Sequence, residues 1–532
     1  MTPDVGEGRL RVRWLGKVAY DDALALQRGL FAGTADHLLL LEHPPVYTLG
    51  VRADLANVLV PPAAVGAELV RADRGGDVTY HGPGQLVGYP IVSVPGKRGG
   101  GMADTVAYVR SIAELLIDVL ADLGLDGRWD QRFPGVWVDD RKIAAIGVRL
   151  SRGRSMHGFA LNVDPDLTMF DHIVPCGLDG RRVTSLRAEG IDVSIDEVVE
   201  LVTTHASARW GAVERQDTTR FQPPAFVGTV TPVKLAGRLA QAGVVGGLEV
   251  GERKPEWLRA PLRLDVEQRR LQRTMRELKL VTVCEEAGCP NLSECWSDGT
   301  ATFMINGERC TRACGFCLVD TRHPEPIDVD EPERVAEAVA RMGLSHAVVT
   351  AVARDDLPDG GAGAFARTIE AIRRRRPGCA VEVLISDCKG DPDALDLIYA
   401  ARPDVLDHNL ETVLRLQRAV RPSASYARSL AVLARAKAAG LTTKSGLILG
   451  MGETDDEVIG ALADLHGIGV DIVTLGQYLR PTAKHLPVAR WVHPETFAAL
   501  KDAGEAMGIP HVEASPLTRS SYHAKQAAEA TA

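Results

Sequence analysis

Hydrophobic and polar residues alternate with two different periods along the first part of this chain. Short alternating or apolar runs predict strands, and apolar residues at helical spacing predict helices. The expected strands begin at residue 9 and lie within 37–49, 135–138, 142–150 and 157–163, and the expected helices span 21–31, 103–125 and 195–210. This part of the chain is therefore predicted to form a mixed α/β domain.

Strand and helix patterns take turns in the second part of the chain. The expected strands span 301–305, 346–352, 380–385, 404–410, 441–449 and 472–479, and the expected helices span 363–376, 392–401, 411–417, 455–468 and 494–507. About six βα units predict a parallel sheet whose carboxyl edge carries the functional site. Six units rather than eight predict an open, partial barrel.

Between these parts, residues 215–251 contain turn formers and no sustained period. We therefore expect a first domain over 1–215, a linker over 216–251 and a second domain over 252–532. The two domains share no visible repeat, which indicates a fusion and not a duplication.

Composition and charge exclude several classes of protein. The chain has 532 residues, 45% of them hydrophobic and 25% charged, and its formal net charge of -9 argues against a nucleic-acid or membrane-surface binder. No apolar run approaches the roughly 20 residues of a membrane span, and no basic stretch followed by an apolar run opens the chain. Nine cysteines, an odd number, fit a reducing compartment, so a cytoplasmic enzyme is expected.

Three cysteines form a C-x3-C-x2-C run at Cys310, Cys314 and Cys317. Three thiolates can each hold one iron of a four-iron cluster, and no neighbouring cysteine is placed to cap the fourth. An open iron can chelate a substrate, which in radical enzymes is S-adenosylmethionine, so this spacing is the radical-SAM signature. The alternative is a zinc knuckle, although such sites usually have four ligands in paired motifs.

A second incomplete set lies just upstream at Cys284, Cys289 and Cys295, spaced x4 and x5. Three ligands again fall one short of a four-iron cluster. Two incomplete sets in one short span favour iron–sulfur chemistry over zinc or over packing.

With residues 519–524, Arg-Ser-Ser-Tyr-His-Ala, the two cysteine sets resemble lipoyl synthase. The resemblance implies two [4Fe-4S] clusters: a radical-generating one at 310–317, and an auxiliary one at 284–295 that is consumed as the sulfur donor. It implies Ser521 as fourth ligand of the auxiliary cluster, although from its residue type alone Ser521 is an ordinary polar residue. It also implies three S-adenosylmethionine contacts: Phe316, Asn409 and Glu411.

The first part of the chain has a glycine-rich block and one cysteine. Residues 74–85 contain four glycines and a proline, which permit the backbone to approach a ligand closely. The chain has no G-x-G-x-x-G or G-x-x-x-x-G-K-[ST] loop before a helix, which counts against a ligase that uses ATP. Cys176 lies among turn-forming residues that would present a thiolate, although a single cysteine is more often a small buried side chain.

This part of the chain resembles lipoyl octanoyltransferase, of biotin/lipoate ligase-like fold. The resemblance rests on four blocks, residues 74–81, 142–147, 157–162 and 175–178. It implies that Cys176 takes octanoyl from acyl carrier protein as a thioester and that Lys142 is its acid and base. The implied substrate-binding residues are Arg74, Gly75, Gly76, Asp77, Val78, Thr79, Tyr80, His81, Ala145, Ile146, Gly147, Gly158, Phe159 and Ala160.

The leading hypothesis is one polypeptide that transfers octanoyl to a lipoyl-domain lysine and then inserts sulfurs at carbons six and eight. The implied acceptors are the lipoyl domains of 2-oxoacid dehydrogenases and the glycine cleavage H protein, and an electron donor is required. One alternative is that one half is only a docking module for lipoyl domains, against which the intact catalytic residues argue. The other is an ATP-dependent lipoate ligase, disfavoured by the missing nucleotide loop.

Overall fold

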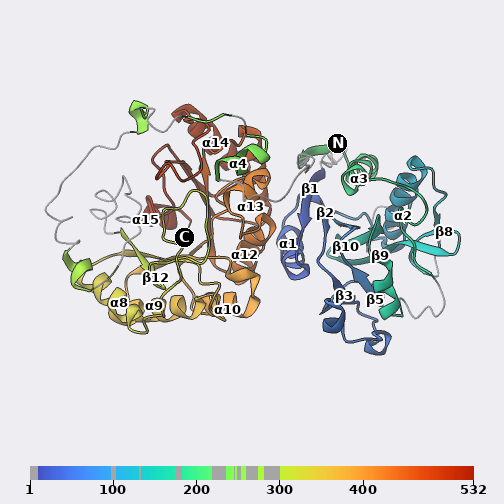
Figure 1. Ribbon diagram of the computed structural model, residues 1–532, viewed down its shortest axis with the longest axis horizontal. Helices are drawn as coiled ribbons and strands as arrows, with labels where there is room; N and C mark the ends of the chain where they lie inside the picture. The colour runs from blue at the N-terminus through green and yellow to red at the C-terminus, as the bar shows by residue number, and fades with distance from the viewer. Residues whose placement is uncertain are drawn as a thin grey trace. The chain divides into compact units, whose positions relative to one another are not determined.

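The computed structural model describes residues 10–96, 103–130, 133–174, 182–217, 235–244, 246–248, 253–258, 273–278, 280 and 300–531. The chain forms two compact units, residues 1–220 and 221–532 (Figure 1). Among the described residues no helix has the length and apolar character needed to cross a bilayer.

The main sheet of the first unit has eight strands in the order β11-β1-β2-β6-β10-β9-β8-β7. The strands are β1 (Leu10–Lys17), β2 (Asp36–Glu42), β6 (Gln85–Ile91), β7 (Arg128–Trp129), β8 (Gly135–Val138), β9 (Arg141–Ser151), β10 (Arg154–Asn162) and β11 (Val213–Asp217). β1 pairs in parallel with β2 and β11, and the remaining pairs are antiparallel. In β9 and β10, Ala145 lies opposite Ala160 and Gly147 opposite Gly158, so two predicted substrate-binding blocks are direct neighbours.

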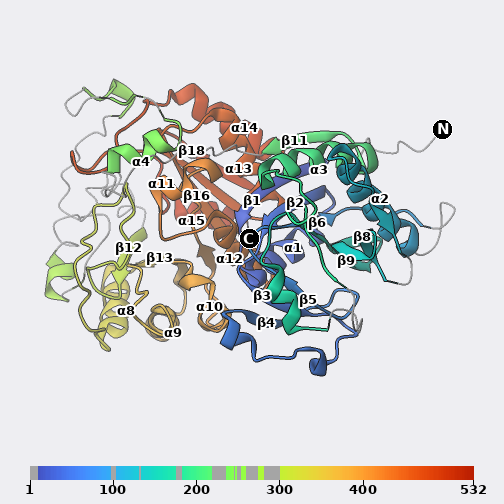
Figure 2. The same ribbon diagram turned by 45° about the vertical axis from the view of Figure 1, so that its right-hand side comes forward.

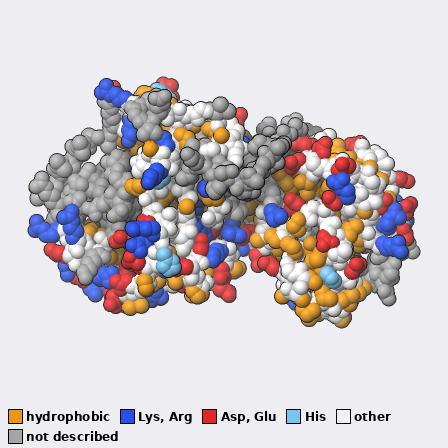
Figure 3. Space-filling model, viewed as in Figure 1, with side chains coloured by type: hydrophobic (Ala, Val, Ile, Leu, Met, Phe, Trp, Pro, Cys, Tyr) orange, Lys and Arg blue, Asp and Glu red, His pale blue; other side chains and the backbone are white. Residues whose placement is uncertain are grey.

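A second, three-stranded sheet has the order β4-β3-β5, with β3 (Val46–Leu49), β4 (Glu68–Arg71) and β5 (Val78–His81). β5 lies inside the glycine-rich block, because its β-branched and aromatic residues favour a strand and pair with β3. Short 3-10 helices flank this sheet: η1 (Leu55–Asn57), η2 (Pro62–Val65) and η4 (Leu167–His172). Figure 3 shows many hydrophobic side chains on the visible surface of this part of the first unit.

Three helices cover the main sheet: α1 (Tyr20–Ala32), α2 (Thr105–Asp122) and α3 (Ile195–Trp210). Apolar residues at helical spacing in α2, such as Ile112, Leu116 and Val119, are fully buried in one core with β1, β2, β9 and β10. α3 begins with a capping box in which Ser194 and Glu197 satisfy each other's backbone amides. These helices agree with the mixed α/β prediction (Figures 1 and 2).

The second unit contains a seven-stranded parallel sheet whose strands follow the order of the sequence, β12 to β18. The strands are β12 (Thr300–Ile305), β13 (His346–Ala351), β14 (Ala380–Leu384), β15 (Val405–Asp407), β16 (Thr442–Leu449), β17 (Ile472–Gln477) and β18 (His511–Ala514). Each strand pairs in parallel with the next. The predicted parallel sheet is confirmed, with one more strand, β18, than the pattern indicated.

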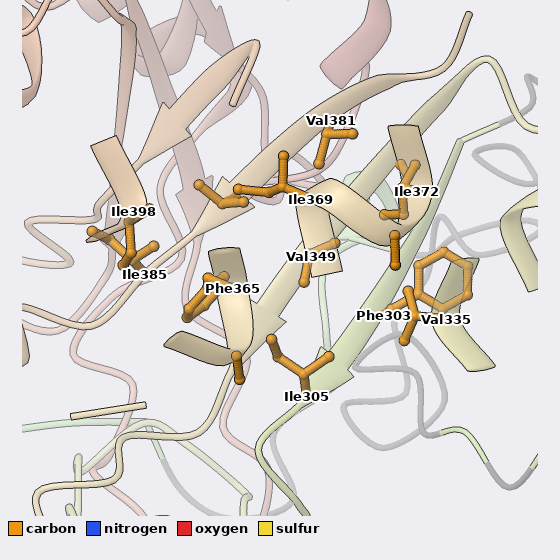
Figure 4. Packing of buried hydrophobic residues seen from close by; sticks show 14 of the residues in the cluster. Phe303, Ile305, Val335, Val349, Phe365, Ile369, Ile372, Val381, Ile385 and Ile398 are labelled. Atoms are coloured by element: carbon orange, nitrogen blue, oxygen red, sulfur yellow. The ribbon is translucent and has the colours of Figure 1, made fainter. Parts of the chain in front are cut away.

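Helices cover one face of this sheet. The longer ones are α8 (Glu331–Met342), α9 (Ala362–Arg375), α10 (Pro392–Ala400), α12 (Tyr426–Ala438), α13 (Asp455–Gly467) and α14 (Pro494–Ala506). Figure 4 shows their packing: Phe365 and Ile369 of α9 lie against strand residues such as Val349. On the other face of the sheet, Ala527 of α15 (Ala524–Ala530) packs with Val405 and Ile472.

The helix predicted over 411–417 is wrong. Glu411 has a φ of 64°, in the left-handed region, so no right-handed helix can begin there. The chain instead forms a 3-10 turn, η8 (Leu414–Leu416), followed by the short α11 (Gln417–Val420).

Part of the segment expected as linker packs against the second unit. α4 (Leu235–Gln241) contacts α11, and the Ala242 carbonyl accepts a hydrogen bond of 2.5 Å from Arg415. The Leu248 amide donates to the carbonyl of Val488 at 2.7 Å. Residues 235–248 therefore belong with the second unit by their contacts.

Candidate functional site

A cavity of about 550 Å³ opens in the first unit. All the expected substrate-binding residues line it except Tyr80, and Lys142 lines it as well. The ring of Tyr80 lies against Tyr47 and Phe170, at centroid distances of 5.5 and 5.4 Å, in an apolar cluster that adjoins the cavity through Phe170. Tyr80 is thus the one member of its block that does not line this cavity, and its role in substrate binding stays a prediction.

Close backbone packing shapes this cavity. The Gly75 amide donates to the Val148 carbonyl at 3.0 Å and so attaches the glycine-rich block to β9. A Cβ on Gly147 would lie 2.9 Å from the Gly75 oxygen, and one on Gly158 would lie 2.1 Å from the Gly88 oxygen. Both positions thus require glycine, because neighbouring backbone occupies the place of a Cβ atom.

Lys142 lies beside the chain that follows the cysteine segment. Its amide donates to the Arg182 carbonyl, and its carbonyl accepts from the Thr184 amide, both at 3.0 Å. Its Nζ is 5.6 Å from the ring centroid of Trp137. Cys176 itself lies outside the described residues.

The described chain before the cysteine segment is also fixed near the cavity. The Val174 amide donates to the Asn57 carbonyl at 2.8 Å, and Phe170 lines the cavity. Val183, after the segment, lines it too. The residues on both sides of 175–181 therefore adjoin the cavity that contains Lys142.

A series of buried hydrogen bonds supports this arrangement. His81 Nδ1 and Gln85 Oε1 are 2.8 Å apart, Gln85 donates to Asn162 at 2.9 Å, and Asn162 donates to the Thr184 carbonyl at 2.9 Å. Burial lowers the pKa of His81 well below its usual range, so the imidazole is neutral and its Nδ1 can donate to the amide oxygen. This series connects the glycine-rich block to the backbone that pairs with Lys142.

Sequence reasoning missed the aromatic and histidine residues at another part of the cavity: Tyr20, Tyr89 and His157. His157 is buried with a φ of 57°, and its Nε2 lies 2.7 Å from Asp73 Oδ1. His43 bridges Val18 and Tyr89 through contacts of 2.7 Å on each ring nitrogen. A lone histidine in a strand pattern has no sequence signal for such contacts, since the partners are far away along the chain.

The three cysteines at 310–317 follow β12, at the carboxyl edge of the seven-stranded sheet in the second unit. The Cys310 amide donates to the Asp320 carbonyl and the Gly315 amide to the Val420 carbonyl, each at 2.8 Å. Burial raises the pKa of Cys314, and it raises that of Cys317 to about 12. A raised pKa favours the neutral thiol, and coordination to a metal ion favours the thiolate instead.

The donor set at this loop fits an iron–sulfur cluster. Among the described residues, no three Cys, His, Asp or Glu side chains converge on one metal ion. A four-iron cluster instead takes each thiolate on a different iron, so three cysteines on one loop can supply three of its ligands. Cys284, Cys289 and Cys295 lie outside the described residues.

Beside this loop, the end of β15 carries unsatisfied polar groups. Asn409 donates to Ser520 Oγ at 2.7 Å and to Glu411 Oε1 at 3.2 Å, while its Oδ1 is buried without a partner. Burial raises the pKa of Glu411. The buried hydroxyl of Thr412 and the side-chain amide of Gln417 also lack partners. Such groups fit a polar ligand like S-adenosylmethionine.

The C-terminal motif reaches the same edge. Ser520 Oγ accepts a hydrogen bond from Asn409, as described, and the backbone amide of Gln477, the last residue of β17, donates to the Pro516 carbonyl at 3.3 Å. Ser521 is the next residue along and is partly buried. Phe316 lies in the cysteine loop beside Gly315. The structure therefore brings the predicted radical-cluster and cofactor residues and the neighbourhood of Ser521 to one edge of the sheet.

Known proteins resemble both units. The lipoyl protein ligase A/B catalytic domain matches residues 18–207, and the radical SAM superfamily matches residues 304–465. A lipoyl synthase of Rubrobacter xylanophilus is 56% identical over 278 residues, which cover 52% of this chain and 87% of that protein. One of Mycobacterium avium is 54% identical over 285 residues, 53% of this chain and 93% of that protein.

The chain belongs to the lipoyl synthase family. Because the lipoyl synthase relatives align with about half of this chain, the family match leaves room for a second catalytic domain. A lipoate-protein ligase A solved with ATP is 23% identical and covers 40% of this chain and 88% of its own, with a TM-score of 0.35, too low to add support. The chain thus joins a lipoyl ligase or transferase catalytic domain to a radical SAM lipoyl synthase domain, and both serve lipoate biosynthesis.

Proposed function

We propose that this lipoyl synthase relative carries out two consecutive steps of lipoyl assembly. It would transfer octanoyl from acyl carrier protein to a lysine of a lipoyl domain, and then insert two sulfur atoms at carbons six and eight. The observation that supports the first step most directly is the cavity that joins Lys142 to the chain on both sides of the Cys176 segment.

In the first step, the Cys176 thiolate attacks the octanoyl thioester carbonyl. The C–S bond to the carrier breaks, and Lys142, as ammonium, gives its proton to the departing carrier thiolate. The amine of Lys142 then takes a proton from the acceptor lysine as that lysine attacks the Cys176 thioester. The amide forms and the thiolate is released, ready for another cycle.

The cavity would hold the acyl chain during this exchange. Its volume of about 550 Å³ lies within the range of small-ligand pockets. Its lining along β9 and β10 consists mainly of apolar Ala, Ile and Phe side chains and of glycine backbone, which suit an octanoyl chain.

In the second step, Cys310, Cys314 and Cys317 would hold the radical-generating cluster, and Phe316, Asn409 and Glu411 would bind S-adenosylmethionine. When bound, the cluster supplies the electron that splits S-adenosylmethionine. We propose a second [4Fe-4S] cluster as sulfur source, held by Cys284, Cys289, Cys295 and Ser521. The unpaired Oδ1 of Asn409 supports its role, because a bound ligand would satisfy it.

The proposed partners follow from these reactions. Octanoyl acyl carrier protein supplies the acyl group, and lipoyl domains of 2-oxoacid dehydrogenases and the glycine cleavage H protein receive it. An electron donor reduces the radical cluster.

Anaerobic incubation tests both steps. The protein is mixed with octanoyl acyl carrier protein, unmodified lipoyl domain, S-adenosylmethionine and reductant, and the intact mass of the domain is measured. We expect an octanoyl adduct without S-adenosylmethionine and a lipoyl adduct with it. The proposal is contradicted if the lipoyl domain stays unmodified, or if its modification requires ATP and free octanoate.

Cys176→Ser separates the two steps. We expect this variant to lose octanoyl transfer and to convert an already octanoylated domain as the unmutated protein does, since the thioester forms only on Cys176. Loss of sulfur insertion in this variant would show that the two sites are not independent.

A further inference from the structure

Arg312 is a buried cation between the first and second cysteines of the radical-SAM run. Its side chain is only 6% exposed. Its Nε and one terminal nitrogen, Nη2, donate to the two carboxylate oxygens of Asp355, both at 2.8 Å, and Nη2 also donates to Asp387 at 2.6 Å. Asp355 follows β13 and Asp387 follows β14. One side chain thus ties the cysteine loop to two strand ends.

The backbone of the same loop is fixed to the same place. Thr311 Oγ1 donates to the Ala353 carbonyl at 2.9 Å and accepts from the Asp355 amide at 3.0 Å. The amide of Arg312 lies 3.4 Å from the sulfur of Cys310, toward which it donates. Hydrogen bonds to cluster sulfurs are among the factors that set a cluster's reduction potential.

The charges around Arg312 are unequal. It faces two carboxylates, and that of Asp387 is fully buried with one oxygen lacking any partner. Without the guanidinium, two acidic groups beside the cysteine loop would lose the cation that both of them contact, and only the more remote charge of Arg428 would still act on Asp387. A buried charge left unpaired is costly, and negative charge near a cluster opposes its reduction.

We propose that Arg312 is the positioning residue that holds the cysteine loop in the shape that retains its cluster, and that its charge keeps the cluster reducible. The inference rests on the proposed function, in which Cys310, Cys314 and Cys317 bind that cluster. Arg312 acts through the loop and the two aspartates and is not itself a ligand.

Two substitutions separate shape from charge. Arg312→Gln removes the charge and the fork of hydrogen bonds. Arg312→Lys keeps the charge, but an ammonium cannot make the same planar bidentate contact with Asp355 while also reaching Asp387. Compared with Arg312→Gln, the Arg312→Lys variant should therefore recover the midpoint potential of the cluster more fully than it recovers cluster retention.

The matched control is Arg415→Gln. Arg415 lies in the same unit, is partly buried with 20% of its side chain exposed, and donates to both oxygens of Glu457 at 2.6 and 2.8 Å. None of its recorded partners lies in the loop 310–317. The control therefore reports the effect of losing a partly buried bidentate arginine without touching the cysteines.

The experiment uses full-length protein in which Cys284, Cys289 and Cys295 are replaced by alanine, so that only the radical cluster remains. After anaerobic reconstitution we measure the iron content per chain and the rate of iron loss to a chelator. The midpoint potential of the cluster is measured by a redox titration monitored by electron paramagnetic resonance. For Arg312→Gln we expect about tenfold or faster iron loss, as for other residues that orient ligands, and a more negative potential. For Arg312→Lys we expect fast iron loss with a potential close to that of the background.

If the Arg312→Gln and Arg415→Gln variants have the same iron retention and the same midpoint potential, the inference is overturned while the cluster assignment stays intact. A background protein that binds no iron would overturn the cluster assignment, and the inference with it. Thermal unfolding of each variant without iron shows whether lost retention merely reflects a lost fold, and an unfolded Arg312→Lys would likewise count against a positioning role.

Discussion

Lys142 lies where two stretches of the first unit meet, with its backbone paired to residues 182 and 184. We expect Lys142→Ala to reduce octanoyl transfer strongly near neutral pH, because no ammonium then favours the Cys176 thiolate. The defect should ease at high pH, where more of the thiol ionises unaided. Initial transfer rates between pH 6.5 and 9.5 measure this, with the exposed Lys17→Ala as control. A defect of equal size at every pH would instead indicate a structural lysine.

His43 makes the stability of the first unit depend on pH. Burial lowers its pKa from 6.5 to about 4. Below about pH 6.5 the unfolded chain therefore binds a proton that the folded chain refuses, so stability is full above pH 6.5 and falls as the pH approaches 4. One such histidine accounts for about 3 kcal/mol over this window.

Substitution of His43 tests this expectation. The free energy of unfolding of the first unit is measured with denaturant at pH 7 and at pH 4. Between these pH values, His43→Gln should lose up to about 3 kcal/mol less of this free energy than the unmutated protein does. Tyr89→Phe removes the 2.7 Å partner of His43 but keeps the imidazole, so it should lower stability by about 1 kcal/mol without reducing the pH dependence. Equal slopes for His43→Gln and the unmutated protein would refute the assignment.

Strand β10 passes unusually close to β6 at Gly158. A Cβ there would lie 2.1 Å from the Gly88 oxygen, a distance that only movement of the backbone can relieve. We expect Gly158→Ala to destabilise the first unit by about 1–3 kcal/mol and to narrow the cavity. Denaturant unfolding measures the first effect and octanoyl transfer the second. Gly378→Ala lies in the second unit, where nothing is within 4 Å of the new Cβ, and as a control for the added methyl group it should leave the unfolding of both units unchanged.

The period of the pattern was sufficient for most strands and helices, but it did not lead to a prediction of two long helices, α8 and α12. It also failed where a local conformation or a short element decided the outcome. Glu411 interrupts a helical pattern because the chain turns there with a positive φ, which the period cannot reveal. β18 has only four residues, too few for a period to be distinguished from chance. Tyr80 was grouped with the lining residues of its block, but its ring packs against Tyr47 and Phe170, a contact that the sequence does not reveal because Phe170 lies 90 residues further along the chain.

The predicted site followed from chemistry that is local in sequence. Cysteine spacing identifies a ligand set because all its members lie on one short loop, and the glycine-rich block is equally compact. Arg312 could not be assigned in that way, since its partners are 43 and 75 residues further along the chain. Contacts at such separations require the order of strands in the sheet, which the sequence pattern does not fix.

The whole chain should carry two clusters. If each is a four-iron cluster, the unmutated protein binds about eight irons. Replacing Cys310, Cys314 and Cys317 by alanine should leave about half the iron and abolish cleavage of S-adenosylmethionine. Replacing Cys284, Cys289 and Cys295 should also leave about half the iron, with cleavage to 5'-deoxyadenosine retained and sulfur insertion lost. About four irons in the unmutated protein, or sulfur insertion without the upstream cysteines, would contradict the two-cluster assignment.

The sequential order of the seven strands has a consequence for synthesis on the ribosome. Each strand pairs with the one made just before it, so the sheet can grow as the chain emerges. The segment around Ser520, which bonds Asn409, and helix α15 emerge only after all seven strands. The nascent second unit therefore passes through a stage in which its strands are paired but the carboxyl edge still lacks Ser520 and Ser521. The first unit, made earlier, can fold before that stage ends.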